Sequence, residues 1–102
     1  MKDTSLSQFV RDRKGNARGL VVATVINNQI RLGWSYTNTT AGDKFDKHRA
    51  YDIAFGRAEF GWGPNVRVPH TVNKVLHRMS NRASRYYKQH TDETSYDFNL
   101  SV

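Results

Sequence analysis

Few residues of this chain have the types and spacing that catalysis requires. Asp43, Asp46 and Lys47 lie close together, and two carboxylates with a lysine are groups that a metal-dependent nuclease uses. The same acids are explained more simply as capping residues at the start of a helix, where the helix dipole favours negative charge. We therefore expect a protein that is not an enzyme, and we keep a nuclease acting through Asp43 and Asp46 as an alternative.

Other patterns that indicate reactive sites are missing from the sequence. There is no cysteine, and the four histidines (His48, His70, His77 and His90) give no zinc-like spacing on the helix predicted after residue 70. No Gly-x-Ser-x-Gly motif is present, and Ser80 lies one turn from His77 without an acid nearby. The Gly-Trp-Gly segment lacks the Lys-Ser/Thr pair of a phosphate-binding loop. We expect no catalytic residue, no metal ion and no cofactor.

Basic side chains are the strongest functional signal. The chain has 16 Lys and Arg against 9 Asp and Glu, a formal net charge of +7. Residues 61–90 hold six of the basic residues and no acidic one, whereas residues 91–102 are acidic. A cationic segment attracts polyanions, chiefly nucleic acid, or an acidic protein surface.

One predicted helix carries most of these charges. It begins after Thr71 as N-cap and runs to about His90, because apolar residues recur there at helical spacing. That apolar stripe is Val72, Val75, Leu76, Met79, Ala83 and Tyr86, and the cations Lys74, Arg78, Arg82, Arg85 and Lys88 lie on the opposite side. Successive turns of such a helix can follow a phosphate backbone.

A second set of cations surrounds the first predicted hairpin and the outer face of the sheet. Its members are Arg11, Arg13, Lys14, Arg18 and Arg31. No helix-turn-helix, zinc-finger or RNA-recognition signature is present, which favours phosphate-led binding with little sequence specificity. We predict that both sets bind DNA or RNA.

Trp62 supports a different prediction. It lies between two glycines, and an exposed tryptophan there would stack on a base or anchor the chain in a partner's pocket. It would equally serve as a cap on the core. The alternative function is therefore an inhibitor or modulator that docks on an acidic surface of a host protein, with Trp62 as the anchor.

The N-terminal half predicts an antiparallel β-meander. Turns are indicated at residues 14–16 and 27–29, and between them lies a β-branched apolar run typical of a central strand. The next strand alternates, with Ile30, Leu32, Trp34 and Tyr36 on one face and Arg31 on the other. Before the first turn we expect a third strand, or alternatively a helical turn through Leu6, Phe9 and Val10.

A first helix is predicted from an Asp43 N-cap to about Glu59. Ala50, Ala54 and Ala58 form a stripe of small residues, and further apolar residues on another side suggest a helix packed between two neighbours, such as the sheet and the second helix. Residues 61–65 then break the helix. The expected fold is α+β, a three-stranded antiparallel meander packed by two helices. We expect one domain at 1–90 and an acidic polar tail at 91–102.

Length and composition fit one small domain. The chain has 102 residues, 37% of them hydrophobic, with 12 aromatics to enlarge a small core. No apolar run is long enough to span a membrane, and the charged N-terminus does not fit a signal peptide. We expect a cytoplasmic protein without a membrane partner.

Several segments resemble small accessory proteins encoded by tailed bacteriophages. They are residues 9–16 and 19–23, the Gly-Trp-Ser at 33–35, the Gly-Asp-Lys-Phe-Asp-Lys at 42–47 that leads to the Ile-Ala-Phe-Gly-Arg-Ala helix, and residues 82–88. The resemblance implies an accessory role in the cytoplasm of an infected bacterium, by binding nucleic acid or by modulating a host factor. It implies no catalytic residue.

Overall fold

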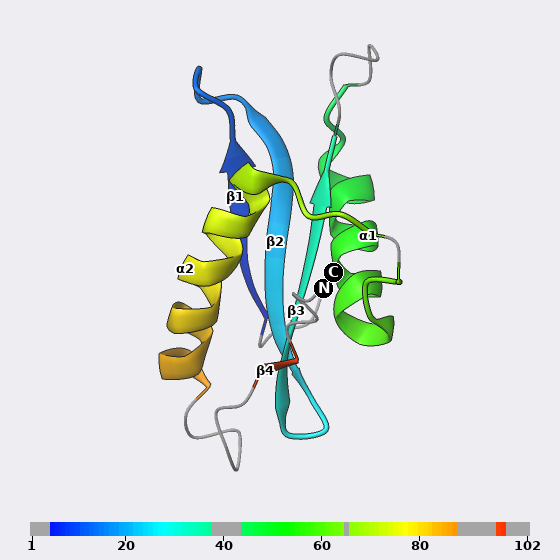
Figure 1. Ribbon diagram of the computed structural model, residues 1–102, viewed down its shortest axis with the longest axis vertical. Helices are drawn as coiled ribbons and strands as arrows, with labels where there is room; N and C mark the ends of the chain where they lie inside the picture. The colour runs from blue at the N-terminus through cyan, green and yellow to red at the C-terminus, as the bar shows by residue number, and fades with distance from the viewer. Residues whose placement is uncertain (1–4, 38–43, 65, 88–95, 98–102) are drawn as a thin grey trace.

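Three strands form an antiparallel meander, followed by two helices and a short fourth strand. The computed structural model describes residues 5–37, 44–64, 66–87 and 96–97. Its elements are β1 (Leu6–Arg11), β2 (Ala17–Ile26), β3 (Gln29–Tyr36), α1 (Lys47–Phe60), α2 (His70–Tyr86) and β4 (Tyr96–Asp97). The sheet order is β1-β2-β3-β4, with β4 parallel to β3. Figure 1 shows β1, β2 and β3 side by side, between the two helices. The predicted α+β fold is confirmed, and Leu6–Arg11 is a strand rather than the alternative helical turn.

Residues that accept a positive φ make the two hairpins possible. Asn27 and Asn28 have φ values of 53° and 64°, which a two-residue hairpin requires and which asparagine tolerates better than most residues. In the first hairpin, Gly15 takes φ 86°. The two predicted turns are thus confirmed, although Gln29 already belongs to β3.

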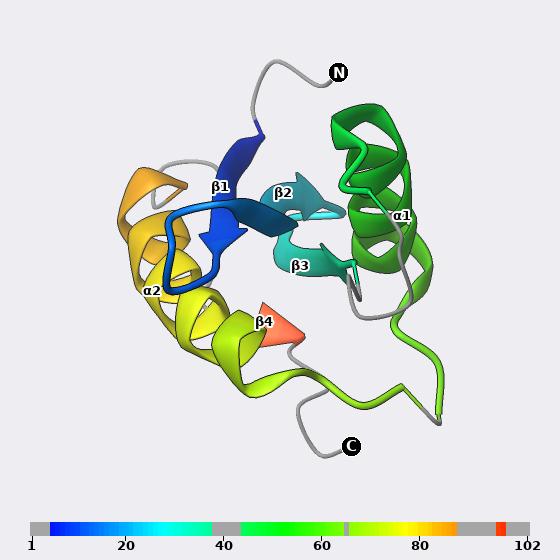
Figure 2. The same ribbon diagram turned by 90° about the horizontal axis from the view of Figure 1, so that it is seen from above.

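The helices cover opposite faces of the sheet, as the view from above shows (Figure 2). Alternate residues of β2 therefore enter two separate cores. Val21 and Ala23 pack towards α2, and Leu20 and Val22 pack towards α1. A strand buried on both faces reads as a continuous apolar run, which is the pattern of residues 20–23.

The α1 face is closed by very small residues. Ala50, Ala54 and Ala58 are buried against the sheet, and Gly33 of β3 lies directly beneath them. A Cβ placed on Gly33 would lie 1.8 Å from the Ala54 carbonyl oxygen and 2.7 Å from the Ala58 nitrogen. The helix backbone therefore rests on the strand backbone.

The α2 face holds the larger core. Val72, Val75, Leu76, Met79 and Ala83 contribute from the helix. The sheet contributes Leu6, Val10, Val21, Ala23, Ile30, Leu32 and Trp34. The predicted apolar stripe is confirmed except at its end, because Tyr86 is 56% exposed and Tyr87 takes the core position. The helix ends at Tyr86, and the C-cap Tyr87 turns its hydroxyl to donate to the Ala23 carbonyl at 3.2 Å.

The outer edge of β3 is occupied along its length. β4 pairs with Ile30 and Arg31, the Trp62 indole N–H donates to the Leu32 carbonyl at 2.9 Å, and Arg57 donates to the Trp34 carbonyl at 2.8 Å. The guanidinium of Arg57 also lies 4.2 Å from the centre of a Trp34 ring. Side chains from α1 and the segment after it thus block a sheet edge that would otherwise pair with another strand.

Three local predictions about the helices are wrong. Asp46, not Asp43, caps α1, because its carboxylate accepts from the N–H groups of His48 and Arg49 at 3.0 and 3.2 Å. Asp43 lies outside the described residues. Thr71 is inside α2, which begins at His70 after Pro69 with φ −60°, the value that proline fixes before a helix. Finally, α1 is not packed on two sides: its second apolar side remains open, with Ile53 39% and Phe60 86% exposed.

The close contact at Gly33 predicts that adding one methyl group there strongly lowers the stability of the fold. Gly33→Ala forces backbone against backbone and is expected to lower the free energy of unfolding by about 2 kcal/mol or more. Gly56→Ala is the matched control, because no atom lies within 4 Å of its added Cβ and alanine favours a helix by about 1 kcal/mol. Chemical denaturation measures both. Equal stability of the two variants would contradict the close approach.

Burial of Tyr87 predicts a loss of stability in alkali. Burial, together with the nearby Tyr86, raises the pKa of Tyr87 from 10.0 to about 12. The unfolded chain ionises first, so the stabilisation is complete below pH 10 and is lost as the pH rises towards 12. Tyr87→Phe should cost about 1 kcal/mol at neutral pH, because it loses the bond to Ala23, and should unfold with a weaker alkaline dependence. Denaturation midpoints from pH 8 to 12 test this, and parallel curves for both proteins would refute it.

Candidate nucleic-acid interface

The outward side of α2 carries a row of cations. Lys74, Arg78, Arg82 and Arg85 are all exposed, as predicted, because the opposite side of the helix is anchored in the core. Their spacing of three or four residues places them about 5–6 Å apart along the axis. Among the described residues none of the four has an ion-pair partner, and α2 contains no acidic residue. We call these four residues the α2 cationic row. Lys88, the predicted fifth member, lies outside the described residues.

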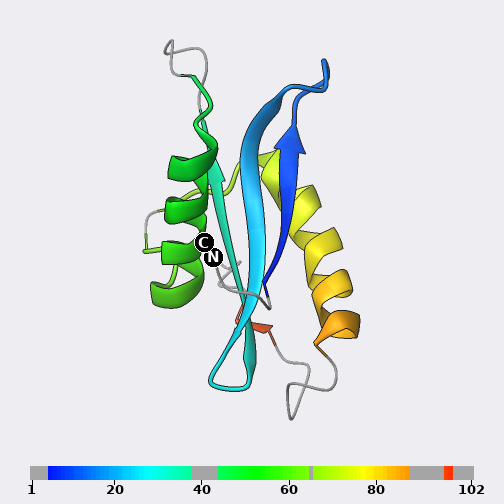
Figure 3. The ribbon, with the colours of Figure 1, turned by 180° about the vertical axis from the view of Figure 1, so that it is seen from behind.

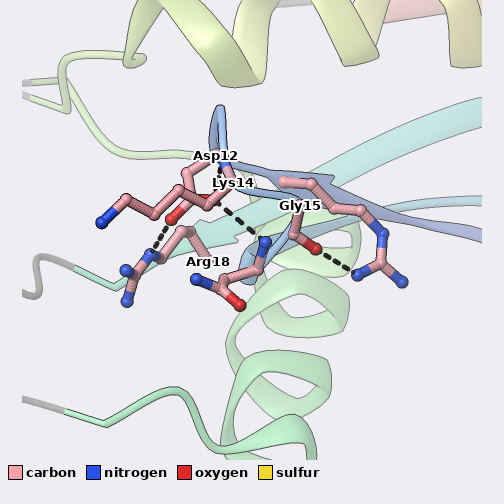
Figure 4. A network of polar contacts seen from close by, with 6 residues as sticks. Asp12, Lys14, Gly15 and Arg18 are labelled. Carbon is pink, nitrogen blue, oxygen red and sulfur yellow. Dashed lines mark hydrogen bonds and ion pairs between the residues drawn. The ribbon is translucent and has the colours of Figure 1, made fainter.

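The tip of the first hairpin is held in shape by Asp12. One oxygen of its carboxylate accepts from the N–H groups of Lys14 and Asn16, each at 2.9 Å, and the other accepts from Arg18 Nε at 2.9 Å (Figure 4). The N–H of Asn16 is the main cause that keeps the pKa of Asp12 below its ordinary value, and Arg18 acts in the same direction against a desolvation effect. The carboxylate of Asp12 is therefore occupied by hydrogen-bond donors of its own hairpin.

This network divides the predicted hairpin cations into two kinds. Arg18 is half-buried and bound to Asp12, so it stabilises the turn. Arg13 and Lys14 are exposed at the tip, and their side chains have no ion-pair partner among the described residues. The hairpin extends beyond the N-terminal end of α2, as Figure 3 shows from behind.

A groove joins the hairpin strand to α2. It has a volume of about 450 Å³ and runs between Gln8–Arg11 of β1 and the first turns of α2. Arg11, Lys74 and Arg78 line it, and no acidic residue does. Arg11 donates to the Gly15 carbonyl at 2.8 Å, which fixes its position. The two predicted sets of cations are therefore continuous, and Arg11 of the predicted hairpin set connects them. Its basic type was visible in the sequence, but its neighbour across the groove was not.

Two predicted site residues do not belong to this surface. Arg31 is half-buried and lies on the face that α1 covers, because its register partner Thr24 shares that face with Val22. Each face of the sheet is packed against one of the two helices. Trp62 is only 4% exposed, and it packs edge-on against Trp34 with ring centres 6.1 Å apart. The prediction that Trp62 anchors a partner is wrong, because its indole closes the core and the β3 edge.

In the described part of the chain, the residues considered for catalysis do not come together in one site. The carboxylate of Asp46 is occupied in capping α1, and the Ser80 hydroxyl donates to the His77 carbonyl at 2.8 Å within its own helix. Within the described ranges, no group of three or more metal-ligating side chains occurs. In that same part of the chain, no helix has the length and apolar character to span a membrane.

The Asp12 network predicts an acid-sensitive turn. Because the folded state lowers the pKa of Asp12, its contribution is present above the ordinary value of 3.8 and is lost as the pH falls below it. The amide proton resonances of Lys14 and Asn16 should move together in NMR spectra, with a midpoint below 3.8. Asp12→Asn should abolish this titration. A midpoint above 3.8 would contradict the hydrogen-bonded carboxylate.

Comparison with protein-family models, with curated proteins and with solved structures finds no significant match to this chain.

Proposed function

We propose that this protein binds nucleic acid, DNA or RNA, through phosphate contacts from the α2 cationic row and the β1–β2 hairpin. The observation that carries the proposal is the row itself: four exposed cations at one-turn spacing with no ion-pair partner among the described residues. Arginine binds phosphate oxygens through two parallel hydrogen bonds, and its charge does not depend on pH in the physiological range.

The hairpin extends the same surface. Arg13 and Lys14 stand at a tip that Asp12 holds in place, so they meet a bound strand with little loss of conformational freedom. Arg11 continues the positive charge from the tip to Lys74 and Arg78 through the groove. A duplex or a single strand lying along α2 would therefore reach the hairpin without crossing an acidic residue of the described surface.

The side chains on this surface favour recognition of the sugar-phosphate backbone of a nucleic acid over recognition of its bases. An outer helix anchored by one side in a core presents only its other side, and the exposed residues there include the four cations of the α2 cationic row and no acid. Affinity should then depend steeply on salt and weakly on sequence. The resemblance to phage accessory proteins is compatible with this role, and the modulation of a host protein through an acidic surface is the second candidate, now without Trp62 as its anchor.

Charge reversal tests the surface. Arg78→Glu combined with Arg85→Glu should reduce the affinity for a labelled duplex by at least about 100-fold, because four units of charge change on the row. Lys44→Glu combined with Arg49→Glu changes the charge equally at exposed positions near the start of α1, and should weaken binding much less. Fluorescence anisotropy measures affinity, and circular dichroism confirms folding.

The salt dependence gives a second readout. The slope of log affinity against log salt should become shallower by about 1.8 in the Arg78/Arg85 variant, from about 0.9 for each lost phosphate contact on a duplex. Duplex and single-stranded DNA and RNA of equal length identify the preferred form. Equal affinities of the two double variants would refute the assignment to α2.

A further inference from the structure

The outer edge of β1 exposes backbone groups that are ready to pair. The side chains of Trp62 and Arg57 donate to the Leu32 and Trp34 carbonyls from outside β3. Leu32 and Trp34 therefore direct their backbone N–H and C=O groups away from β2. Their register partners Ala23 and Val21 must then bond to β1, at Leu6 and Gln8. The residues between, Ser7 and Phe9, consequently direct their N–H and C=O groups outwards.

The two edges of the sheet differ in whether their outward backbone groups are hydrogen-bonded. At β3, a strand and two side chains occupy the outer groups, as described above. At β1, the outward backbone groups of Ser7 and Phe9 have no hydrogen-bond partner among the described residues. Residues 6–10 also contain no charge and no proline, two of the means by which a protein prevents pairing at an edge, and the irregularity of register in β1 lies only at its end, between Val10 and Arg11. No described part of the chain therefore occupies the β1 edge, and a further strand has room to pair there.

Cations flank this edge on both faces of the sheet. On the α2 side, Lys74 and Arg78 line the groove beside β1. On the α1 side, the ammonium of Lys47 lies 5.9 Å from the centre of the Phe9 ring. Arg11 belongs to both flanks, because its guanidinium lies 5.5 Å from the same ring and the residue also lines the groove. A strand added at β1 would direct alternate side chains to these two flanks. Acidic side chains fit both of them.

We propose that the β1 edge accepts an extended acidic segment of a partner protein, which joins the sheet as an additional strand. Main-chain hydrogen bonds to Ser7 and Phe9 supply the pairing, and the flanking cations select for acidic side chains. A second copy of this chain fits poorly, because pairing β1 with β1 would bring together two sets of Arg11, Lys74 and Arg78. A nucleic acid lacks the regular alternation of N–H and C=O that the edge offers. This interaction is additional to phosphate binding by α2.

The test uses the full chain and a labelled peptide in which Glu and Val alternate, with about eight residues to match a strand. The same peptide carrying N-methyl groups on alternate amides keeps the charge but cannot form the ladder. We expect it to bind at least about tenfold more weakly by fluorescence anisotropy. Hydrogen exchange by NMR should show the Ser7 and Phe9 amides slowed at least about tenfold by the unmodified peptide. Equal binding of both peptides, or no slowing at Ser7 and Phe9, overturns the proposal.

A pair of variants separates the backbone from the side chain. Ser7→Pro removes one outward N–H without removing a bond to β2, and should weaken peptide binding by about tenfold. Ser7→Ala loses the same hydroxyl, to which Tyr51 donates at 2.8 Å, but retains the N–H and should bind like the unaltered chain. If Ser7→Pro does not fold, the N-methyl comparison and the exchange measurement still decide.

Other occupants of the edge give different results. A dimer in light scattering that Ser7→Pro converts to a monomer would overturn the proposal in favour of a second copy. Slowing of the Ser7 and Phe9 amides by a DNA duplex but not by the peptide would overturn it in favour of nucleic acid. We expect Ser7→Pro to bind a DNA duplex with unchanged affinity. This measurement distinguishes failure of strand pairing at β1 from failure of phosphate binding at α2.

Discussion

The contact between Gly33 and the backbone of α1 determines how the rest of the chain is arranged. Because neither Gly33 nor Ala54 and Ala58 carries a bulky side chain, the helix settles directly on β3 and β2. Its C-terminal end then lies at the outer edge of β3. From there Arg57 and Trp62 reach the strand's free carbonyls, and the chain passes to the other face, where α2 begins. One close approach thus closes a sheet edge and assigns each helix to its own face.

The basic residues acquire different roles through their neighbours. Arg57 and Arg18 have the same side chain as Arg78, but one is bound to a strand carbonyl and the other to Asp12. The cations of the α2 row have no such partner among the described residues, since their helix lacks acids and lies on the outside. Net charge therefore indicates attraction for polyanions, and only the contacts separate structural cations from those free to bind one.

The two surfaces proposed for binding meet at β1. Within the described ranges its outer edge has no paired strand whereas that of β3 does, and its neighbour across the groove is the N-terminal half of α2. Lys74 and Arg78 accordingly belong to the α2 cationic row and also flank the strand edge. A partner protein and a nucleic acid would compete for these two side chains but not for Arg82 and Arg85, which lie further along the helix.

The sequence by itself determined the elements that local forces control. Turn residues with positive φ located both hairpins, the apolar period located α2, and its cations lay opposite the apolar stripe as predicted, because helix geometry alone places them there. Tertiary structure decided what depends on distant partners. The sequence left Trp62 open between an exposed anchor and a cap on the core, and packing against Trp34 makes it the cap, while Arg31 is half-buried on the face that α1 packs against. Arg11 lies across the groove from Lys74 because the fold packs β1 beside α2. Local spacing cannot predict such contacts, since they form between residues that lie tens of positions apart.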